Sequence, residues 1–530
     1  MKKWFVIILL ASAQFVMVLD STVMNVSMST VAKDLGTTIT GMQAAITFYT
    51  LTMAALMLTG AKLGDIWGRL PAFRIGAVIY GIGSLITGLS VSLGMLLFGW
   101  SLVEGLGAVL VIPAIASLAA TNYKGKDRMV AFSAIGVATG LAAAAGPLIG
   151  GFVTTYLSWR YVFFAETLVM LFVLLVSGKI KDTKVLKKPK LDIKGAVLSA
   201  AGMGILVLGV LQSKTWGWIT PMKKPVINGH EIAPLGVSLV AYLILIGAVL
   251  LWYFFKVESK LEAQKKTPLL KVSLLKIPVL KSGLRVLAAQ YFVIASIFFI
   301  IPVYLQTILG YDALKTGLKI LPLSVGLVIF SVIGSKMVTN YSPRKIVRGG
   351  QLLLVAGCLV LVGTVSPSLN GILFSIGMIV TGAGLGLLAS QIGNINMSAV
   401  GKEDTAEAGG LQGTFQNLGS SVGTALVGSV FIAVLLSGFT TSVNQSQLSQ
   451  STKNQVNAAT QNGIGIVSQQ QAEQAVLAKG GDQATATELS QQYQTAQIQG
   501  LKEALFFVSA VGLLSILLSK DLPVDDPRTA

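Results

Sequence analysis

Long apolar stretches alternate with short polar segments along the whole chain. A helix needs about 20 mostly apolar residues to cross the roughly 30 Å of hydrocarbon in a bilayer. Stretches that meet this requirement lie at 5–28, 42–61, 74–93, 95–119, 129–154, 161–178, 195–213, 235–256, 284–309, 316–337, 346–366, 370–397, 407–437 and 501–520. The pattern predicts an all-α integral membrane protein with 14 transmembrane helices.

Composition excludes most other classes of protein. Of the 530 residues, 53% are hydrophobic and only 12% are charged, whereas a soluble domain carries about 25% charged residues. The single Cys358 and the single His230 leave no intramolecular disulfide and no cysteine metal cluster. No glycine loop followed by Lys-Ser/Thr is present to cradle phosphates. We therefore expect neither an enzyme nor a resident cofactor or metal.

Charge indicates how the chain is oriented. Most of the 40 Lys and Arg residues fall on the side of the N-terminus when the segments between spans are assigned alternately to the two faces of the membrane. Basic residues favour the cytoplasmic side, so we expect both termini in the cytoplasm. We expect the protein to lie in the plasma membrane of a bacterial cell. The +18 net charge then reflects this bias rather than a nucleic-acid partner, and the lipid bilayer is the expected partner.

Three carboxylates lie inside apolar stretches: Asp20, Glu104 and Glu166. An ionisable group in hydrocarbon is costly and is a functional candidate by default. A hydrogen-bonded, purely structural acid is the alternative, most clearly for Glu104. We expect these three acids to exchange protons.

The segment after the second stretch carries a recognisable motif. It includes Asp65, Gly68 and Arg69, with Arg74 following at the start of the third predicted helix. Here a carboxylate and two guanidinium groups could pair in one state of the protein and separate in another. The spacing resembles the loop between helices two and three of the major facilitator superfamily, where this group acts as a cytoplasmic gate.

Other motifs extend the resemblance over most of the chain. The fifth stretch contains Gly146, Pro147, Gly150 and Gly151, which is similar to the antiporter motif of exporters in that superfamily, although small residues at this spacing also serve helix packing. The sequence around Asp20 resembles the helix-one motif of the fourteen-helix drug:proton antiporter branch. In helix four the chain departs from the family pattern, because Ser101 and Glu104 stand where arginine and glutamine are usual.

The resemblance implies a major facilitator fold, with two six-helix bundles in a pseudo-twofold arrangement and two additional central transmembrane helices. A degenerate second copy of the gate motif places Thr339 where Asp65 lies in the first. The implied units are an N-terminal bundle at 1–178, a basic cytoplasmic loop at 179–194, the two additional helices at 195–256, a second basic loop at 257–283, a C-terminal bundle at 284–520 and a cytoplasmic tail at 521–530.

The expected function is proton-coupled efflux of amphipathic or cationic drugs by alternating access, with a monomer as the working unit. Export of an endogenous lipid, glycolipid or peptide stays open as an alternative, as does a non-transporting sensor. Polar and aromatic residues expected to line the substrate cavity are Gln14, Asn25, Tyr49, Gln290, Tyr291, Tyr304 and Gln306.

The polar segment 438–500 is rich in Gln, Ser, Asn, Thr and Ala. Such a composition favours a solvated loop that is disordered or weakly helical. A helical hairpin over an external exit is the alternative, because Ile464, Ile466, Val467, Val476 and Leu477 form a modest apolar stripe.

Overall fold

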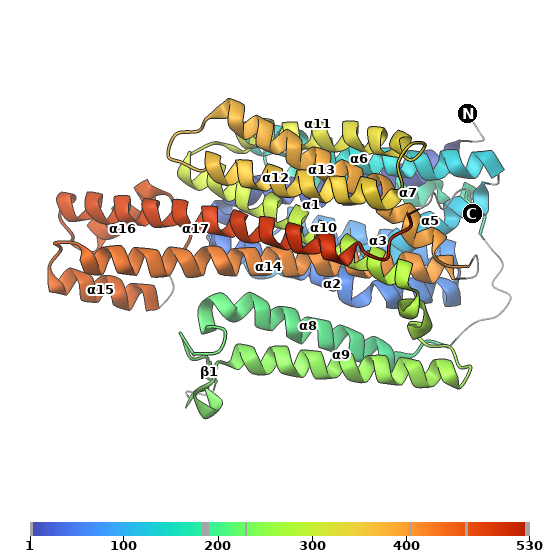
Figure 1. Ribbon diagram of the computed structural model, residues 1–530, viewed down its shortest axis with the longest axis horizontal. Coiled ribbons are helices and arrows are strands. Elements are labelled where there is room, and N and C mark those ends of the chain that lie inside the picture. Colours follow the sequence, from blue (N-terminus) through green and yellow to red (C-terminus); the bar gives the residue numbers. More distant parts are fainter. Residues whose placement is uncertain are drawn as a thin grey trace.

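The computed structural model describes residues 4–123, 125–182, 190–227, 230–401, 404–461 and 465–524. Within these residues, 14 helices are long and apolar enough to cross a membrane. They run along one common direction, and Figure 1 shows both termini at the same end of the bundle. The all-α membrane architecture predicted from the sequence is confirmed.

The first six spans form the N-terminal bundle. The fourth span is one continuous rod made of α4, η1 and α5, in which η1 is a π-helix. The elements are α1 (Phe5–Asp34), α2 (Ile39–Trp67), α3 (Arg69–Gly88), α4 (Leu93–Leu96), η1 (Leu97–Glu104), α5 (Gly105–Asn122), α6 (Gly125–Tyr156), α7 (Arg160–Val176) and the short 3-10 helix η2 (Ser177–Lys179).

The last six spans form the C-terminal bundle. Its elements are α10 (Pro278–Val303), the π-helix η5 (Tyr304–Ile308), α11 (Ala313–Met337), α12 (Pro343–Thr364), α13 (Gly371–Ser398), α14 (Thr405–Gln445), α15 (Gln450–Gln461), α16 (Gln469–Ala478) and α17 (Gln483–Leu518).

Matching contacts in the two bundles support an internal repeat. In the N-terminal bundle, Arg74 Nε of the third span donates to Ser177 Oγ at the end of the sixth span over 2.9 Å. In the C-terminal bundle, Arg348 Nε of the third span donates to Ser519 Oγ at the end of the last span over 3.0 Å. The same clamp therefore closes both halves of the chain at the same end.

The additional helices α8 (Ile193–Trp216) and α9 (Leu239–Ala263) are central in the sequence but peripheral in space. Figure 1 shows them as a pair beside α2 and α14. Ser213 Oγ of α8 bonds Ser429 Oγ of α14 over 3.0 Å. A small turn of β1 (Val226–Ile227), β2 (His230–Glu231) and η3 (Pro234–Gly236) joins the two helices, and η4 (Val272–Lys276) follows them.

In the described part of 438–500 the structure is largely helical, which favours the helical alternative over a disordered loop. Helices α14 and α17 continue beyond the other spans, and α15 packs against the end of α14 while α16 packs against the end of α17 (Figure 1). Tyr493 Oη donates to Gly465 O over 2.7 Å, and Gln497 Nε2 donates to Val467 O over 2.8 Å. Ile466 is buried in this outer bundle, whereas Ile464 lies outside the described residues.

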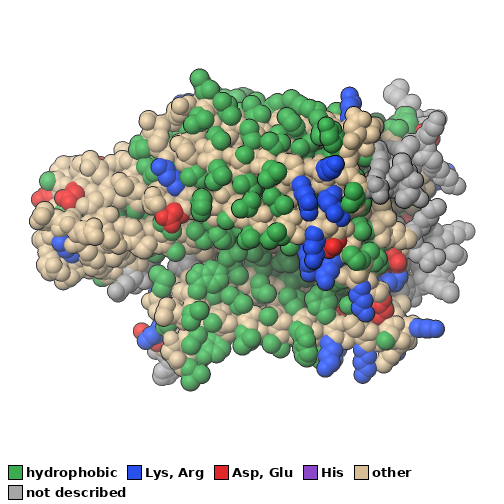
Figure 2. Space-filling model, in the orientation of Figure 1, with side chains coloured by type: hydrophobic (Ala, Val, Ile, Leu, Met, Phe, Trp, Pro, Cys, Tyr) green, Lys and Arg blue, Asp and Glu red, His purple; other side chains and the backbone are tan. Residues whose placement is uncertain are grey.

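The surface has an apolar belt bounded by charge. Figure 2 shows hydrophobic side chains over the middle of the molecule and a band of Lys and Arg toward the end that holds the termini. The outer bundle of α14 to α17 projects from the opposite end. This distribution is the one expected of a multi-pass membrane protein.

Candidate functional site: an enclosed cluster of three acids

The three intramembrane acids come together in the structure. Asp20 lies on α1, Glu104 ends η1 and Glu166 lies on α7, and each offers a carboxylate oxygen within 4.8 Å of the other two. Their exposed fractions are 0%, 0% and 2%. Three carboxylates at this separation in a low-dielectric interior cannot all be ionised, so the cluster holds protons or a cation.

The π-helix η1 and its glycine contacts place Glu104 against α3. A Cβ on Gly83 would lie 2.5 Å from Glu104 N, and one on Gly99 would lie 2.9 Å from Thr87 N. Only glycine permits two backbones to approach so closely. A π-helix is wider than an α-helix and often marks a functional site, and here it brings Trp100 and Glu104 to the cluster.

Asp20 is held by an indole that sequence reasoning missed. Trp100 Nε1 donates to both carboxylate oxygens of Asp20, at 2.8 and 3.0 Å. The Tyr49 ring stacks on Trp100 with 4.8 Å between ring centroids. The signal for Trp100 was its position in the fourth span, four residues before Glu104, but nothing local indicated that it faces the first helix.

Glu104 and Glu166 are poorly satisfied by comparison. Neither carboxylate oxygen of Glu104 has a hydrogen-bond partner among the described residues, and the buried hydroxyl of Tyr80 has none either. Ser84 Oγ donates to Glu166 Oε2 over 3.4 Å, while Glu166 Oε1 has no partner in the same part of the chain. Unsatisfied buried acceptors are costly, so these two carboxylates require a hydrogen-bond donor or a proton.

No buried cation offsets these charges in the part of the chain that the structure describes. Among the described residues, Arg69 is the only Lys or Arg that is buried, and it belongs to the gate motif. Ser101, at the position where the family pattern has arginine, donates to Ala45 O over 2.8 Å. Carboxylates in this arrangement could also bind a hard metal ion, which the sequence pattern did not reveal because the ligands come from three distant helices.

The gate motif lies at the turn between α2 and α3. Gly68 has φ +101°, a conformation that favours glycine, and it lets α3 begin at Arg69 directly after α2. Arg69 pairs with Asp65 and donates to Ala61 O over 3.0 Å. Arg74 lies a turn into α3, and its Nε donates to Ser177 Oγ. In this conformation Arg69 is the guanidinium that pairs with Asp65, and a change of pairing between states stays a prediction.

The glycine motif of α6 lies at contacts with both bundles. A Cβ on Gly146 would lie 1.8 Å from Thr22 Oγ1, and one on Gly150 would lie 2.9 Å from Val23 Cα, both on α1. A Cβ on Gly151 would lie 2.7 Å from Ala313 O of α11, and a Cβ on Gly317 of α11 would lie 2.1 Å from Pro147 O. The motif therefore packs α6 against α1 and against the opposite bundle.

The predicted cavity residues separate into several environments. Asn25 Nδ2 donates to Ser21 O at 2.7 Å, and Gln14 is half-buried on the same helix. Gln290 Nε2 donates to Leu385 O at 3.4 Å, and Tyr291 Oη accepts from Gln416 at 3.2 Å. Tyr49 is the one that lies beside the acid cluster.

Two further predicted cavity residues are engaged in structural contacts. The buried hydroxyl of Tyr304 donates to Ser366 O over 2.9 Å. Gln306 Nε2 donates to Val26 O over 2.7 Å, and its Oε1 accepts from Ser29 N over 3.3 Å. Gln306 thus joins the two bundles at the end that carries α15 and α16. Substrate contact by any of these seven residues stays a prediction.

A second polar cluster, which the sequence did not suggest, fixes the linker after α9. Lys271 pairs with Asp404, and its backbone N–H donates to Glu407 on α14. The hydrogen bond to Asp404 raises the pKa of Lys271 above its ordinary value. Nearby, the buried Glu258 accepts from Leu270 N over 3.0 Å. The linker is therefore attached to both α9 and the C-terminal bundle.

Comparisons with known proteins agree with this architecture. A family model described as Major Facilitator Superfamily matches residues 10–222 and 225–424. A bacterial homologue of the human lysosomal transporter Spinster, solved in an inward-facing and unoccupied conformation, is similar in fold, with a TM-score of 0.61 at 14% identity over 98% of each chain. At this identity the likeness shows the fold alone.

Curated relatives are bacterial transport and resistance proteins. The probable actinorhodin transporter of Streptomyces coelicolor is 28% identical over 84% of this chain and 75% of its own. The puromycin resistance protein pur8 of Streptomyces alboniger is 27% identical over 81% of this chain and 82% of its own length. The multidrug resistance protein Stp of Mycobacterium tuberculosis is 25% identical over 79% of this chain and 74% of its own length. Because the family model covers most of its length, this multi-pass membrane protein belongs to the major facilitator superfamily.

Proposed function

We propose that the protein exports amphipathic or cationic drugs across a bacterial plasma membrane in exchange for protons. The observation that carries this proposal is the enclosed cluster of Asp20, Glu104 and Glu166, which lacks a buried cation among the described residues. The names of the curated relatives, which concern antibiotics and multidrug resistance, support the substrate class.

The chemistry follows from competition for the cluster. Protons entering from outside neutralise carboxylates that cannot all be charged together, and this removes the cost of keeping them away from water. An organic cation arriving from the cytoplasm can pair with the same carboxylates only when they are deprotonated. Each elementary charge that moves down the membrane potential supplies about 2.3 kcal/mol per 100 mV.

Hydrogen bonds between the two bundles must break when the protein changes between its inward-open and outward-open states. Gln306 Nε2 donates a hydrogen bond to Val26 O of α1, and Leu314 N donates to Thr155 Oγ1 of α6 over 3.1 Å. Both contacts lie at the end that carries the outer bundle, and the excess of basic residues at the opposite end supports placing this end outside the cell. Rocking of one bundle against the other breaks these contacts when the outer side opens, while the Asp65–Arg69 pair lies at the cytoplasmic end.

The test is flux in inside-out proteoliposomes with an acidic lumen. A fluorescent organic cation, an uncharged drug-sized compound, a lipid analogue and a short peptide are compared with the pH gradient present, with it dissipated, and with a sodium gradient instead. We expect accumulation of the organic cation only with the pH gradient. Accumulation of the cation without any gradient would overturn the proposal, and selective movement of the lipid or peptide would replace its substrate class.

A further inference from the structure

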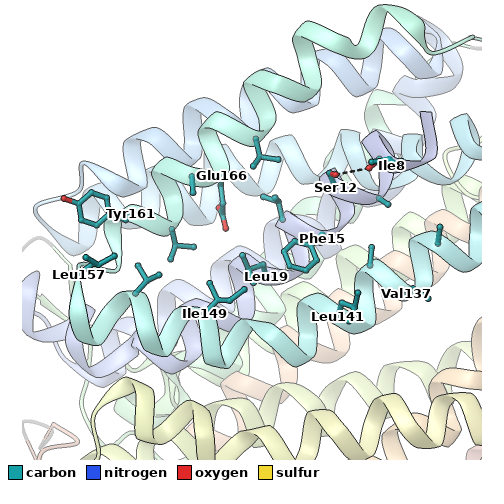
Figure 3. Close-up of a pocket in the computed structure, with 18 residues that line it drawn as sticks. Ile8, Ser12, Phe15, Leu19, Val137, Leu141, Ile149, Leu157, Tyr161 and Glu166 are labelled. Atoms are coloured by element: carbon teal, nitrogen blue, oxygen red, sulfur yellow. Dashed lines mark hydrogen bonds between the residues drawn. The ribbon is translucent and has the colours of Figure 1, made fainter. Parts of the chain in front are cut away.

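A deep groove opens on the membrane-facing side of the N-terminal bundle. It lies between α1, α6 and α7, with a volume of about 770 Å³. Its walls are apolar and include Phe15, Leu19, Leu141 and Ile149 (Figure 3). Cavities of about 300–1,000 Å³ are of the size that holds drug-like molecules.

The mouth of this groove faces lipid. Val137 is 60% exposed and Leu141 is 54% exposed, and both lie on the membrane-crossing part of α6. On the opposite rim, Leu157 and Tyr161 flank the start of α7 and are also exposed. A molecule dissolved in the bilayer can therefore reach the groove without passing between the two bundles.

One carboxylate lies at the floor. Among the described residues that line the groove, Glu166 alone is charged, and Figure 3 shows its side chain directed into the space beside Leu19 and Phe15. Its Oε1 has no hydrogen-bond partner there, although the residue is only 2% exposed. An apolar channel that ends at an unpaired buried acceptor needs a ligand with both an apolar body and a donor.

We propose that this groove is a binding site for lipophilic organic amines that enter from the bilayer, with the ammonium group donating to Glu166. Charge complementarity favours this occupant over a lipid acyl chain, because an acyl chain fills the walls and leaves Glu166 Oε1 unpaired. A charge-assisted hydrogen bond in a dry site is among the stronger polar contacts. The site adds to the proposed export function, on which its role as an entry site rests, and it reaches the acid cluster from the side.

Direct binding to the full-length protein in lipid nanodiscs tests this site separately from transport. The probes are a fluorescent decylamine and the matched decanol, which differ only in the terminal group. We expect the amine to bind about tenfold more tightly than the alcohol. Glu166→Gln should reduce amine affinity to the level of the alcohol while leaving the alcohol unchanged.

Two surface variants keep the test informative even if Glu166→Gln folds poorly. Val137→Trp fills the mouth of the groove and should weaken both probes about tenfold. Val332→Trp is the control, because Val332 is similarly exposed, at 54%, on α11 and away from the groove. Equal binding of amine and alcohol, an amine preference that survives in Glu166→Gln, or equal effects of the two Trp variants would overturn the site.

The outcome is distinguishable from that of the flux experiment. Selective amine binding without gradient-driven flux would remove the proposed function and retain the binding site. Gradient-driven flux that is unchanged in Val137→Trp, together with no amine preference in binding, would remove the binding site and retain the proposed function.

Discussion

The two six-helix bundles share a scaffold but differ in what they bury. Both use an arginine of the third span to clamp a serine at the end of the sixth. In the N-terminal bundle the buried polar groups include three acids, whereas in the described part of the C-terminal bundle they are amides and hydroxyls, such as Gln290, Gln391 and Asn396. We therefore propose that proton exchange belongs to the N-terminal half.

The gate motif repeats the same asymmetry. Asp65 pairs with Arg69 in the first half, while Thr339, at the corresponding position in the second, donates only to Lys336 O of its own turn over 2.9 Å. The comparison teaches that the two halves share their packing, whereas the cluster of buried acids and the Asp65–Arg69 pair belong to the N-terminal half.

Removal of an acid from the cluster in the N-terminal bundle should have the largest effect on efflux. Asp20→Asn and Glu104→Gln should each reduce gradient-driven efflux at least about tenfold, because the cluster can no longer exchange its protons. The measurement is initial flux in proteoliposomes as a function of the pH gradient.

The matched control removes a buried amide from the other half. Gln391→Met deletes a donor to Gly334 O and should lower stability while leaving the pH dependence of flux unchanged. Exposed Glu503→Gln controls for loss of a carboxylate in a span. Normal pH dependence in Asp20→Asn, or its loss in Gln391→Met, would break the assignment of proton exchange to the N-terminal half.

Packing of the glycine motif inside the N-terminal bundle, where α6 contacts α1, should be next in size. Gly146→Ala forces a Cβ against Thr22 Oγ1 and should destabilise the protein by about 1–3 kcal/mol through overpacking. Gly140→Ala in the same helix is the control, since a Cβ there meets nothing within 4 Å. Thermal unfolding in detergent measures both, and equal melting temperatures would show that the glycine is not needed for packing.

The paired clamps should show equal, smaller effects. Arg74→Gln and Arg348→Gln each remove one hydrogen bond to a serine hydroxyl and should each cost about 1 kcal/mol. Neither should alter the pH dependence of flux. Exposed Lys345→Gln serves as the control for loss of a surface cation, and a clamp variant that changes proton coupling would contradict the view that these residues only hold the scaffold.

The linker clamp on the C-terminal bundle should have the smallest effect. Because its folded pKa is raised, Lys271 contributes stability that is fully present below its ordinary pKa of about 10.4 and is lost as the pH rises through the raised value. The contribution of this partly exposed pair should stay below about 1 kcal/mol. Melting temperatures from pH 8 to 11.5 should therefore fall more for the wild type than for Lys271→Met. Lys260→Met, at an exposed position, should follow the wild type.

Hydropathy was sufficient to predict the spans and the three acids, because a carboxylate inside an apolar run is visible in one dimension. It could not predict that the acids converge, since Asp20 and Glu104 come from different helices and meet through the π-helix η1. Trp100 was missed for the same reason. Convergence is a property of helix packing, and glycines such as Gly83 set it by contacts with residues distant in the sequence.

The helices at 438–500 were predicted only as an alternative, for a different reason. Composition indicated a solvated loop, yet Ser468 and Gln471 form a capping box at the start of α16, and this signal is readable in the sequence. Asp482 likewise caps α17, where the Thr485 N–H lowers the pKa of the carboxyl group. Polar helices of this kind form because they pack against the long ends of α14 and α17.

Because α14 is unbroken, a small tilt of this helix moves its protruding end by a large distance. At 1.5 Å per residue, the 41 residues of α14 span about 60 Å, and the helix runs from the inner end of the bundle to the protruding tip. A tilt of about 10° would sweep that tip through about 10 Å. Dyes attached at this tip would magnify small rearrangements of the C-terminal helices, so those rearrangements could be followed without a label near the acid cluster.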